Sequence, residues 1–167
     1  AACHAIRADR NQYAASWGVP PLRDGIAAAF TRRTGVPIDP HEQVTVCCGS
    51  TEAMMAVMLG CLDPGDEIII PEPFYANYNS FACAAGVRVV PVTSRIESGF
   101  SLPPAEEFSS KITPRTKAIV ICNPNNPTGY VYAKEELQAL RTLCKTNQMY
   151  LFSDEAYREF CYEGQVM

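Results

Sequence analysis

The sequence lacks several features that would each point to a particular class of protein. Its lysines and arginines are not clustered beyond Arg32-Arg33, and the net charge is −4, which argues against a dedicated nucleic-acid binder. No apolar run approaches the length of a membrane span, and the longest one, in 53–62, is typical of a buried helix. We therefore expect neither nucleic acid nor membrane among the partners of this chain.

Targeting and metal-binding patterns are also missing. The opening residues, 1–4, contain no charged segment and no apolar core of the kind that signal peptides carry, so the cytoplasm is the expected location. The two histidines lie far apart and no CxxC pair accompanies them, so we expect no metal site. Six cysteines fall inside expected strands and helices and are interpreted as small buried hydrophobes with reduced thiols: Cys47, Cys48, Cys61, Cys83, Cys122 and Cys144.

What is present is the composition of one soluble globular unit, with 47% hydrophobic and 19% charged residues. An unrelated dinucleotide-binding module would carry GxGxxG after its first strand, and the segment 47–52 lacks that pattern. The chain opens without an evident domain start and closes at 164–167, soon after an expected strand and its turn. We therefore expect it to be a piece of a longer protein.

Apolar periodicity predicts strands that alternate with helices. The helix expected over 20–34 places Leu22, Ile26 and Phe30 on one apolar face and ends at Gly35. The helix expected over 51–62 is apolar nearly all round and should be buried. Further helices are expected over 74–85, 103–111 and 133–146, and strands over 43–47, 67–70, 87–92, 117–122 and 149–153. This alternation predicts an α/β unit with a mainly parallel sheet.

Polar residues follow the ends of two expected strands. After the strand at 117–122, the stretch Asn123–Gly129 contains three asparagines, two prolines and a glycine. After the strand at 43–47, Gly49-Ser50-Thr51 opens a helix and points backbone N–H groups and two hydroxyls at one spot. Open α/β folds bind ligands at this edge of the sheet, and a helix start favours an anion. Taken alone, the asparagine stretch is also consistent with a solvated turn, and the Gly49-Ser50-Thr51 stretch with a simple helix cap.

Aromatic and acidic residues follow two more strands. Phe74 and Tyr75 come after the strand at 67–70, where an aromatic ring can stack on a flat ligand or pack in the core. Asp154 and Tyr157 come after the last strand and offer a carboxylate and a phenol. Since the carboxyl ends of parallel strands share one edge, the four groups together predict a single ligand site.

The motif Asn125-Asn126-Pro127-Thr128-Gly129, followed at this separation by Ser153-Asp154-Glu155-Ala156-Tyr157, resembles the class I/II aminotransferases related to aspartate aminotransferase. Gly49-Ser50-Thr51-Glu52-Ala53 and Leu22-Arg23 add to the resemblance. These are fold-type I pyridoxal-phosphate enzymes, so the resemblance implies a three-layer αβα fold whose mainly parallel sheet is mixed in the family. It implies that 1–167 is part of the large, cofactor-binding domain, without the C-terminal small domain.

The resemblance also implies roles at the ring of pyridoxal 5'-phosphate. Asp154 would bind the pyridine nitrogen and keep it protonated, which lets the ring accept an electron pair. Asn126 and Tyr157 would hydrogen-bond the phenolate oxygen of the ring. The Asn126-Pro127 bond would be cis, as in relatives, and would set the aim of the amide.

At the phosphate, the resemblance implies that Gly49, Ser50 and Thr51 hold the group at the helix N-terminus. Tyr75 matches the aromatic that stacks on the ring better than Phe74 does. Tyr13 matches a tyrosine that reaches the phosphate of the neighbouring subunit, so the resemblance implies a homodimer.

One departure from the family pattern concerns catalysis. In the family, a lysine about thirty residues beyond the Asp-x-x-Tyr motif forms the Schiff base and shuttles the proton. The lysines of this chain are Lys111, Lys117, Lys134 and Lys145, and none follows Asp154. We therefore assign no catalytic residue within the chain, and we expect it alone to have no appreciable turnover and to bind the cofactor weakly and noncovalently.

The activity implied for the complete protein is transfer of an amino group from an amino acid to a 2-oxo acid by a ping-pong mechanism. A C–S lyase or an aminocyclopropane-carboxylate-synthase-like enzyme shares the same motifs and fold. A non-catalytic aminotransferase-like binding or regulatory domain is the alternative of another class. The identity of the amino acid is not readable, because the residues that select the side chain lie outside these motifs.

Overall fold

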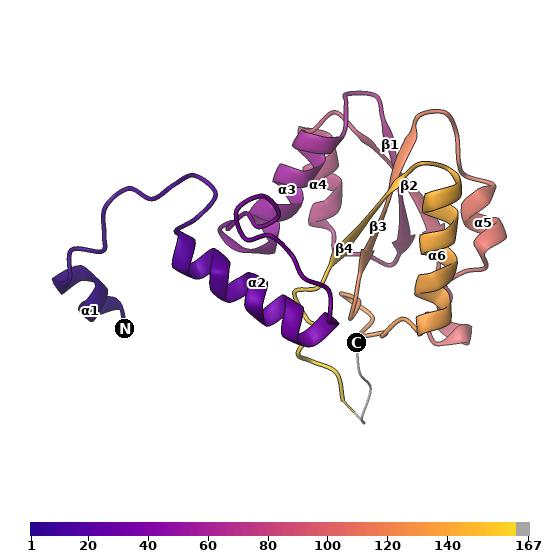
Figure 1. Cartoon of the computed structure of the whole chain (residues 1–167). Coiled ribbons are helices and arrows are strands. Elements are labelled where there is room, and N and C mark those ends of the chain that lie inside the picture. The colour runs from indigo at the N-terminus through magenta and orange to yellow at the C-terminus, as the bar shows by residue number, and fades with distance from the viewer. Residues whose placement is uncertain (163–167) are drawn as a thin grey trace. The chain divides into compact units, whose positions relative to one another are not determined.

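The computed structural model describes residues 1–162, so the closing segment 164–167 lies outside the described part. The chain divides into two compact units, residues 1–49 and the residues from Ser50 onward (Figure 1). Among the residues described, no helix has both the length and the apolar character that crossing a membrane requires.

The first unit contains α1 (Ala2–Arg7) and α2 (Pro20–Thr34). The bounds of α2 confirm the prediction, since proline occupies its first turn, where no N–H bond is lost. It ends at Gly35, which adopts the left-handed conformation with φ 72° and donates its N–H to the carbonyl of Thr31.

The predicted apolar face of α2 is wrong. Leu22 and Ile26 are 47% and 40% exposed, whereas Arg23 is 4% exposed. The guanidinium carbon of Arg23 lies 5.8 Å from the centre of the Trp17 ring, and its Nη1 donates to the carbonyl of His41. Loops of the first unit therefore cover the arginine side of the helix, because the long Arg23 stem packs like an apolar side chain while its head bonds to backbone.

The strand expected over 43–47 is not formed. Val46 donates its N–H to the carbonyl of Trp17, at 3.0 Å, but this segment belongs to none of the sheet pairings among the described residues. Its alternating apolar residues fit a strand, yet a strand needs a neighbour to pair its backbone groups. Sequence periodicity cannot show whether that neighbour exists.

The second unit is built on one four-stranded sheet, in the order β2-β1-β3-β4. The strands are β1 (Glu67–Glu72), β2 (Arg88–Thr93), β3 (Thr116–Cys122) and β4 (Tyr150–Asp154), and all three pairings are parallel. This confirms four of the predicted strands to within two residues at each end. The chain moves outward from β1 to β2 and then returns to β3 on the other side of β1. The crevice between β1 and β3 is thus the switch point at which such sheets bind ligands.

Helices cover both faces of this sheet (Figure 1). The helices are α3 (Gly49–Cys61), α4 (Asn77–Ala84), α5 (Ala105–Ser109) and α6 (Lys134–Thr146), with one 3-10 turn, η1 (Ile96–Ser98). Residues of α3 and α4 pack on Ile68 and Ile70, whereas residues of α5 and α6 pack on Ile69. Alternate strand residues point to opposite faces, so β1 is buried from both sides. The three-layer αβα prediction is confirmed.

Two details of the helices differ from the predictions. The helix expected from Phe74 begins only at Asn77, because the residues before it turn away from β1. Within α3 only Met54 and Met58 are buried, and Leu59 is 57% exposed, so the expectation of an all-round buried helix is wrong. One apolar stripe suffices to pack a helix on a single sheet, and Met54 and Met58 join the core cluster formed with β1, β3 and α4.

The cysteine prediction is half right. None of the eight cysteines, all of which lie in the described residues, forms a disulfide, and the expected burial holds only for Cys122 and Cys144. Cys48, Cys61 and Cys83 are exposed, because they lie on the outer sides of their helices or in a helix-opening turn. Among the described residues, no group of three or more His, Cys, Asp or Glu side chains is placed to hold a metal ion.

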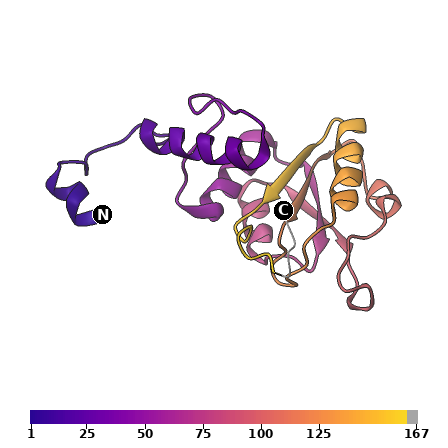
Figure 2. The same cartoon turned by 60° about the horizontal axis from the view of Figure 1, so that its bottom comes forward.

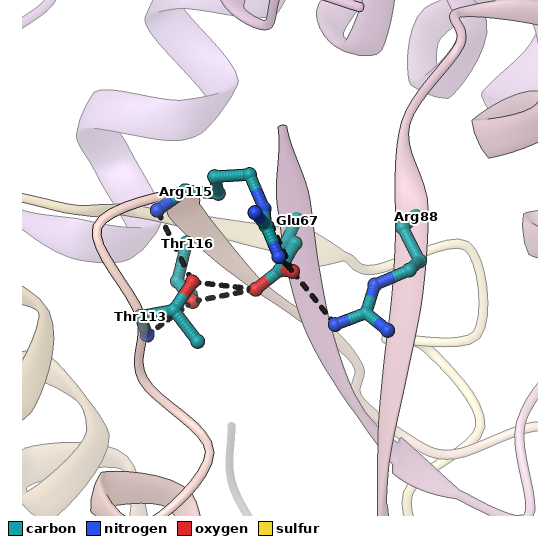
Figure 3. A network of polar contacts seen from close by, with 5 residues as sticks. All are labelled: Glu67, Arg88, Thr113, Arg115 and Thr116. Carbon is teal, nitrogen blue, oxygen red and sulfur yellow. Dashed lines mark hydrogen bonds and ion pairs between the residues drawn. The ribbon is translucent and has the colours of Figure 1, made fainter. Parts of the chain in front are cut away.

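A buried carboxylate ties together the amino ends of three strands (Figure 3). Glu67, the first residue of β1, has a side chain 1% exposed and lies 2.7 Å from a guanidinium nitrogen of Arg88 and 3.0 Å from one of Arg115. The hydroxyl of Thr113 donates to its other oxygen at 2.7 Å. These bonds, led by that of Thr113, lower the pKa of Glu67 to about 2 against the opposing effect of burial.

Candidate cofactor site

Figure 2 turns the carboxyl ends of the strands toward the viewer. A pocket of about 120 Å³ opens at these ends. It is lined by Ser50, Thr51, Tyr75, Tyr78, Cys122, Asn126, Asp154, Ala156 and Tyr157. Six of the predicted site residues are among them, although the strand expected before Ser50 is missing. Gly49 is the first residue of α3 but does not line the pocket, and Tyr13 belongs to the first unit.

The pocket continues on two sides. A cavity of about 310 Å³ between α3 and β4 shares Ser50 and Asp154 with it. Another, of about 450 Å³, shares Asn126 and Tyr157 and extends along the asparagine loop. A ligand larger than the central pocket can therefore reach from α3 across Asp154 to the loop after β3.

Asp154 ends β4 and is held by two hydrogen bonds. Its Oδ2 accepts from the hydroxyl of Tyr78 at 2.9 Å, and its Oδ1 accepts from the backbone N–H of Ala156 at 3.1 Å. The nine residues that line the pocket include no lysine, arginine or histidine. The carboxylate thus faces the pocket with hydrogen-bond donors but without a cation among the lining residues, an arrangement that favours a ligand with a positive or protonated nitrogen.

The loop after β3 fixes the position of Asn126 through its neighbours. Asn123 donates its N–H to the carbonyl of Asp154 at 2.9 Å, and its side-chain oxygen accepts from the N–H of Tyr132 at 3.0 Å. The side-chain oxygen of Asn125 accepts from both the N–H and the hydroxyl of Thr128. The flanking asparagines are therefore structural, and Asn126 alone of the three lines the pocket. The Asn126-Pro127 bond is cis, as the resemblance implied.

Cys122, the last residue of β3, forms part of the pocket wall. It is 4% exposed, and its thiol donates to the carbonyl of Pro124. Burial raises the pKa of the Cys122 thiol, and the nearby Asp154 carboxylate acts in the same direction. The thiol therefore stays protonated, and Cys122 is a neutral wall residue and not a nucleophile.

The start of α3 supplies the opposite end of the pocket. Ser50 and Thr51 lie in its first turn, where backbone N–H groups have no partner within the helix and the helix dipole is positive. Both side chains are exposed and carry hydroxyl donors. Gly49 has φ 81°, a backbone angle that other residues adopt only with strain. This end of the pocket suits an anion such as a phosphate.

Tyr75 offers an aromatic face between these two ends. Its ring is half-buried and stands edge-on to the ring of Tyr78, with centres 5.7 Å apart. Its hydroxyl accepts from the side-chain N–H of Asn77 at 2.7 Å. Phe74 and Tyr75 both pack against the core, but only Tyr75 lines the pocket.

Tyr78 is a site residue that the sequence patterns did not single out. It is 1% exposed and belongs to the core, yet its hydroxyl reaches Asp154. The signal available was its spacing of three from Tyr75, which places two residues near one side of a helix start. Such spacing is common in buried helices, so it does not identify a polar contact by itself.

The donor set fits pyridoxal 5'-phosphate. Asp154 matches a protonated ring nitrogen, Asn126 and Tyr157 offer donors for a ring oxygen, and the start of α3 matches the phosphate. The lining aromatic Tyr75 matches the flat ring. No cation among the lining residues competes with the ring for the carboxylate.

The fold and the site together define a class of protein, the α/β proteins with a pocket at the topological switch point of a parallel sheet. The chain belongs to the class I and II aminotransferases, since the model of that family matches residues 2–167. Pyridoxal phosphate is the cofactor of this family, so the cofactor prediction is confirmed at the level of the family.

The similarity to known relatives extends along nearly the whole of this chain. This chain is 41% identical over 165 residues to the aspartate/prephenate aminotransferase of Thermus thermophilus. The aligned region covers 99% of this chain and 42% of the relative. The chain is 40% identical over 165 residues to the arginine–pyruvate transaminase of Pseudomonas aeruginosa, with 99% and 42% covered. The solved aspartate aminotransferase from Thermus thermophilus with maleate superimposes with a TM-score of 0.93 at 40% identity, covering 99% of this chain and 43% of that one. The chain thus spans less than half the length of these relatives.

Proposed function

We propose that this chain is part of the large domain of a pyridoxal-phosphate-dependent aminotransferase, which moves an amino group from an amino acid to a 2-oxo acid by a ping-pong mechanism. The observation that carries the proposal is the pairing of Asp154 with the start of α3 across one pocket, which contains no lining cation. Within the family, this arrangement suits a cofactor that has a protonated nitrogen at one end and a phosphate at the other.

Six of the nine lining residues have a defined task in this proposal. Asp154 accepts from the ring nitrogen and stabilises its protonated form. Asn126 and Tyr157 donate to the ring oxygen, and Tyr75 packs on the ring. Ser50 and Thr51, with Gly49 before them, hold the phosphate at the start of α3. The bound cofactor supplies the electron sink for breaking a bond at the substrate Cα.

The proton shuttle is the task that no residue of the pocket performs. The lining residues include no lysine, and the four lysines of the sequence all precede Asp154. Without an amine nucleophile, covalent and acid–base steps are lost. The 167-residue chain alone therefore binds the cofactor weakly and noncovalently and has no appreciable turnover.

The substrates are proposed only as a class, an amino acid and a 2-oxo acid. The names of the relatives already span aspartate, prephenate and arginine with pyruvate at similar identity to this chain. The similarity therefore supports the reaction type and not a particular side chain.

Two properties of the whole protein belong to the proposal. A homodimer is supported by Tyr13, which is fully exposed and so free to reach a neighbouring subunit; light scattering of the full-length gene product that gives a monomer mass would contradict it. A cytoplasmic location is supported by eight cysteines that form no disulfide among the described residues, a pattern typical of a reducing compartment. Recovery of the protein outside the cytoplasm after cell fractionation would contradict that location.

The test of the proposal is an absorbance spectrum of the full-length gene product after addition of pyridoxal phosphate. We expect a cofactor band that shifts when amino acids are added and returns when a 2-oxo acid follows. The variant Asp154→Asn should bind the cofactor about tenfold more weakly, since a charged partner of the ring is removed. The proposal is contradicted if the protein shows no cofactor band, or if the band does not shift with any amino acid. The 167-residue chain, measured beside it, should give no amino-acid-dependent shift.

A further inference from the structure

Tyr78 is a buried phenol for which the proposed function has no task. It is the second residue of α4, and its hydroxyl donates to Asp154 Oδ2 at 2.9 Å across 76 positions of sequence. Edge-on contacts with Tyr75 and Phe81, at 5.7 Å and 6.3 Å between ring centres, hold the Tyr78 ring in place. Packing of the ring in the core thus fixes the position of the Tyr78 hydroxyl.

The two hydrogen bonds of Asp154 come from different elements. Tyr78 on α4 holds Oδ2, and the N–H of Ala156, in the turn after β4, holds Oδ1. A carboxylate rotates easily about its last side-chain bond, because that torsion has broad minima. One hydrogen bond leaves this rotation partly free, whereas two bonds from separate elements fix the plane of the group.

The chemistry of the donor matters as much as its position. Burial raises the pKa of Tyr78, and the neighbouring Cys122 and Asp154 raise it further, so the phenol keeps its proton and remains a donor. An arginine or lysine in this place would neutralise the Asp154 charge and compete with a ligand for it. A phenol orients the carboxylate and leaves its charge largely available to the pocket.

We propose that Tyr78 is a positioning residue for the cofactor, which aims the Asp154 carboxylate at the ring nitrogen without neutralising it. The inference rests on the proposed function, because it assumes that Asp154 receives that nitrogen. Tyr78 acts on the cofactor through Asp154, by holding the carboxylate that contacts the ring nitrogen.

A double-mutant cycle on the full-length gene product tests this inference. Pyridoxal phosphate is titrated into cofactor-free wild type, Tyr78→Phe, Asp154→Ala and the double variant, and affinity is read from the quenching of protein fluorescence. With Asp154 present, loss of the hydroxyl should weaken binding about fivefold. In the Asp154→Ala background the same loss should change affinity less than about twofold, because the partner is already gone.

Tyr130→Phe is the matched control. Tyr130 also donates from a phenol to a carboxylate, Glu136 at 3.1 Å, but on the other face of the sheet. Its loss should leave cofactor affinity unchanged, and thermal unfolding of each cofactor-free variant shows that the fold is retained.

The outcomes distinguish the positioning role of Tyr78 from the proposed role of Asp154 in binding the cofactor. Equal losses of affinity for Tyr78→Phe in both backgrounds mean a general structural role and overturn the inference, as does wild-type affinity in Tyr78→Phe. A wild type that does not bind pyridoxal phosphate, or Asp154→Ala with wild-type affinity, overturns the role of Asp154 itself and the inference with it.

Discussion

At the scale of single residues, Ser50 is the sharpest test of where the cofactor phosphate lies. Its hydroxyl stands in the first turn of α3 and lines the pocket. Ser50→Ala should weaken binding of pyridoxal phosphate about tenfold, because a hydrogen bond to a charged group is lost. Binding of pyridoxal, which lacks the phosphate, should not change, and fluorescence titration of both compounds into the full-length gene product measures the ratio.

The control for this prediction is Ser80→Ala, the same change at an exposed position of α4 away from the pocket. It should leave both affinities as they are. Equal weakening of pyridoxal and pyridoxal phosphate by Ser50→Ala would place the phosphate elsewhere.

At the scale of elements, α6 shows a helix start that is only half capped. Glu136, three residues into the helix, accepts from the N–H of Ala133 at 2.7 Å. Ala133 occupies the cap position with an extended backbone but has no side-chain acceptor to return the bond. Ala133→Ser should complete the pair and stabilise the protein by about 0.5–1 kcal/mol.

Urea unfolding of the full-length gene product measures this gain. Ala139→Ser makes the same substitution at an exposed position inside α6 and should instead destabilise by about 0.5 kcal/mol, because serine is a poorer helix former than alanine. A loss of stability in Ala133→Ser would show that the cap geometry is not reached.

The elements also show what could be read from the sequence. The four strands of the sheet and α2 were predicted to within two residues, because β-branched runs and proline or glycine signals are local. The strand at 43–47 and the burial of α3 were not, since pairing and packing partners are set by other segments. The predicted burial of Leu22 and Ile26 on one face of α2 was wrong for the same reason.

The candidate site divides in a similar way. Asp154 and Asn126 could be identified because they follow strands and match a motif. Tyr78 could not, because its role depends on a contact with a residue 76 positions away. Sequence order therefore predicts which side chains arrive at a sheet edge but not which core residues support them.

At the scale of the whole molecule, Glu67 links stability to pH. Its pKa in the folded protein is about 2, below the ordinary 4.5, so its contribution is complete above pH 4.5 and is lost as the pH falls toward 2. The shift corresponds to about 3 kcal/mol, and the exposure of both arginines reduces this to about 2 kcal/mol. Glu67→Gln should therefore destabilise the protein by about 2 kcal/mol at pH 7.

The measurement is urea unfolding of the full-length gene product at pH 7 and pH 3. The difference between wild type and Glu67→Gln should shrink at pH 3, because most of the Glu67 contribution is gone there. Glu107→Gln, at an exposed position of α5, serves as the control and should match wild type at both values. A constant difference across this range would exclude the charged cluster as its cause.

The Glu67 cluster and the pocket occupy opposite ends of the sheet. A six-residue strand separates them by about 17 Å, so a substitution at one end has no direct contact with the other. Mutational drift can then work on the two ends separately. Substitutions in the Glu67 cluster change the stability of the protein to acid and heat, whereas substitutions in the loops after the strands change which ligand is bound. A stabilising substitution at the Glu67 end therefore offsets the stability lost to a substitution in the ligand-binding loops.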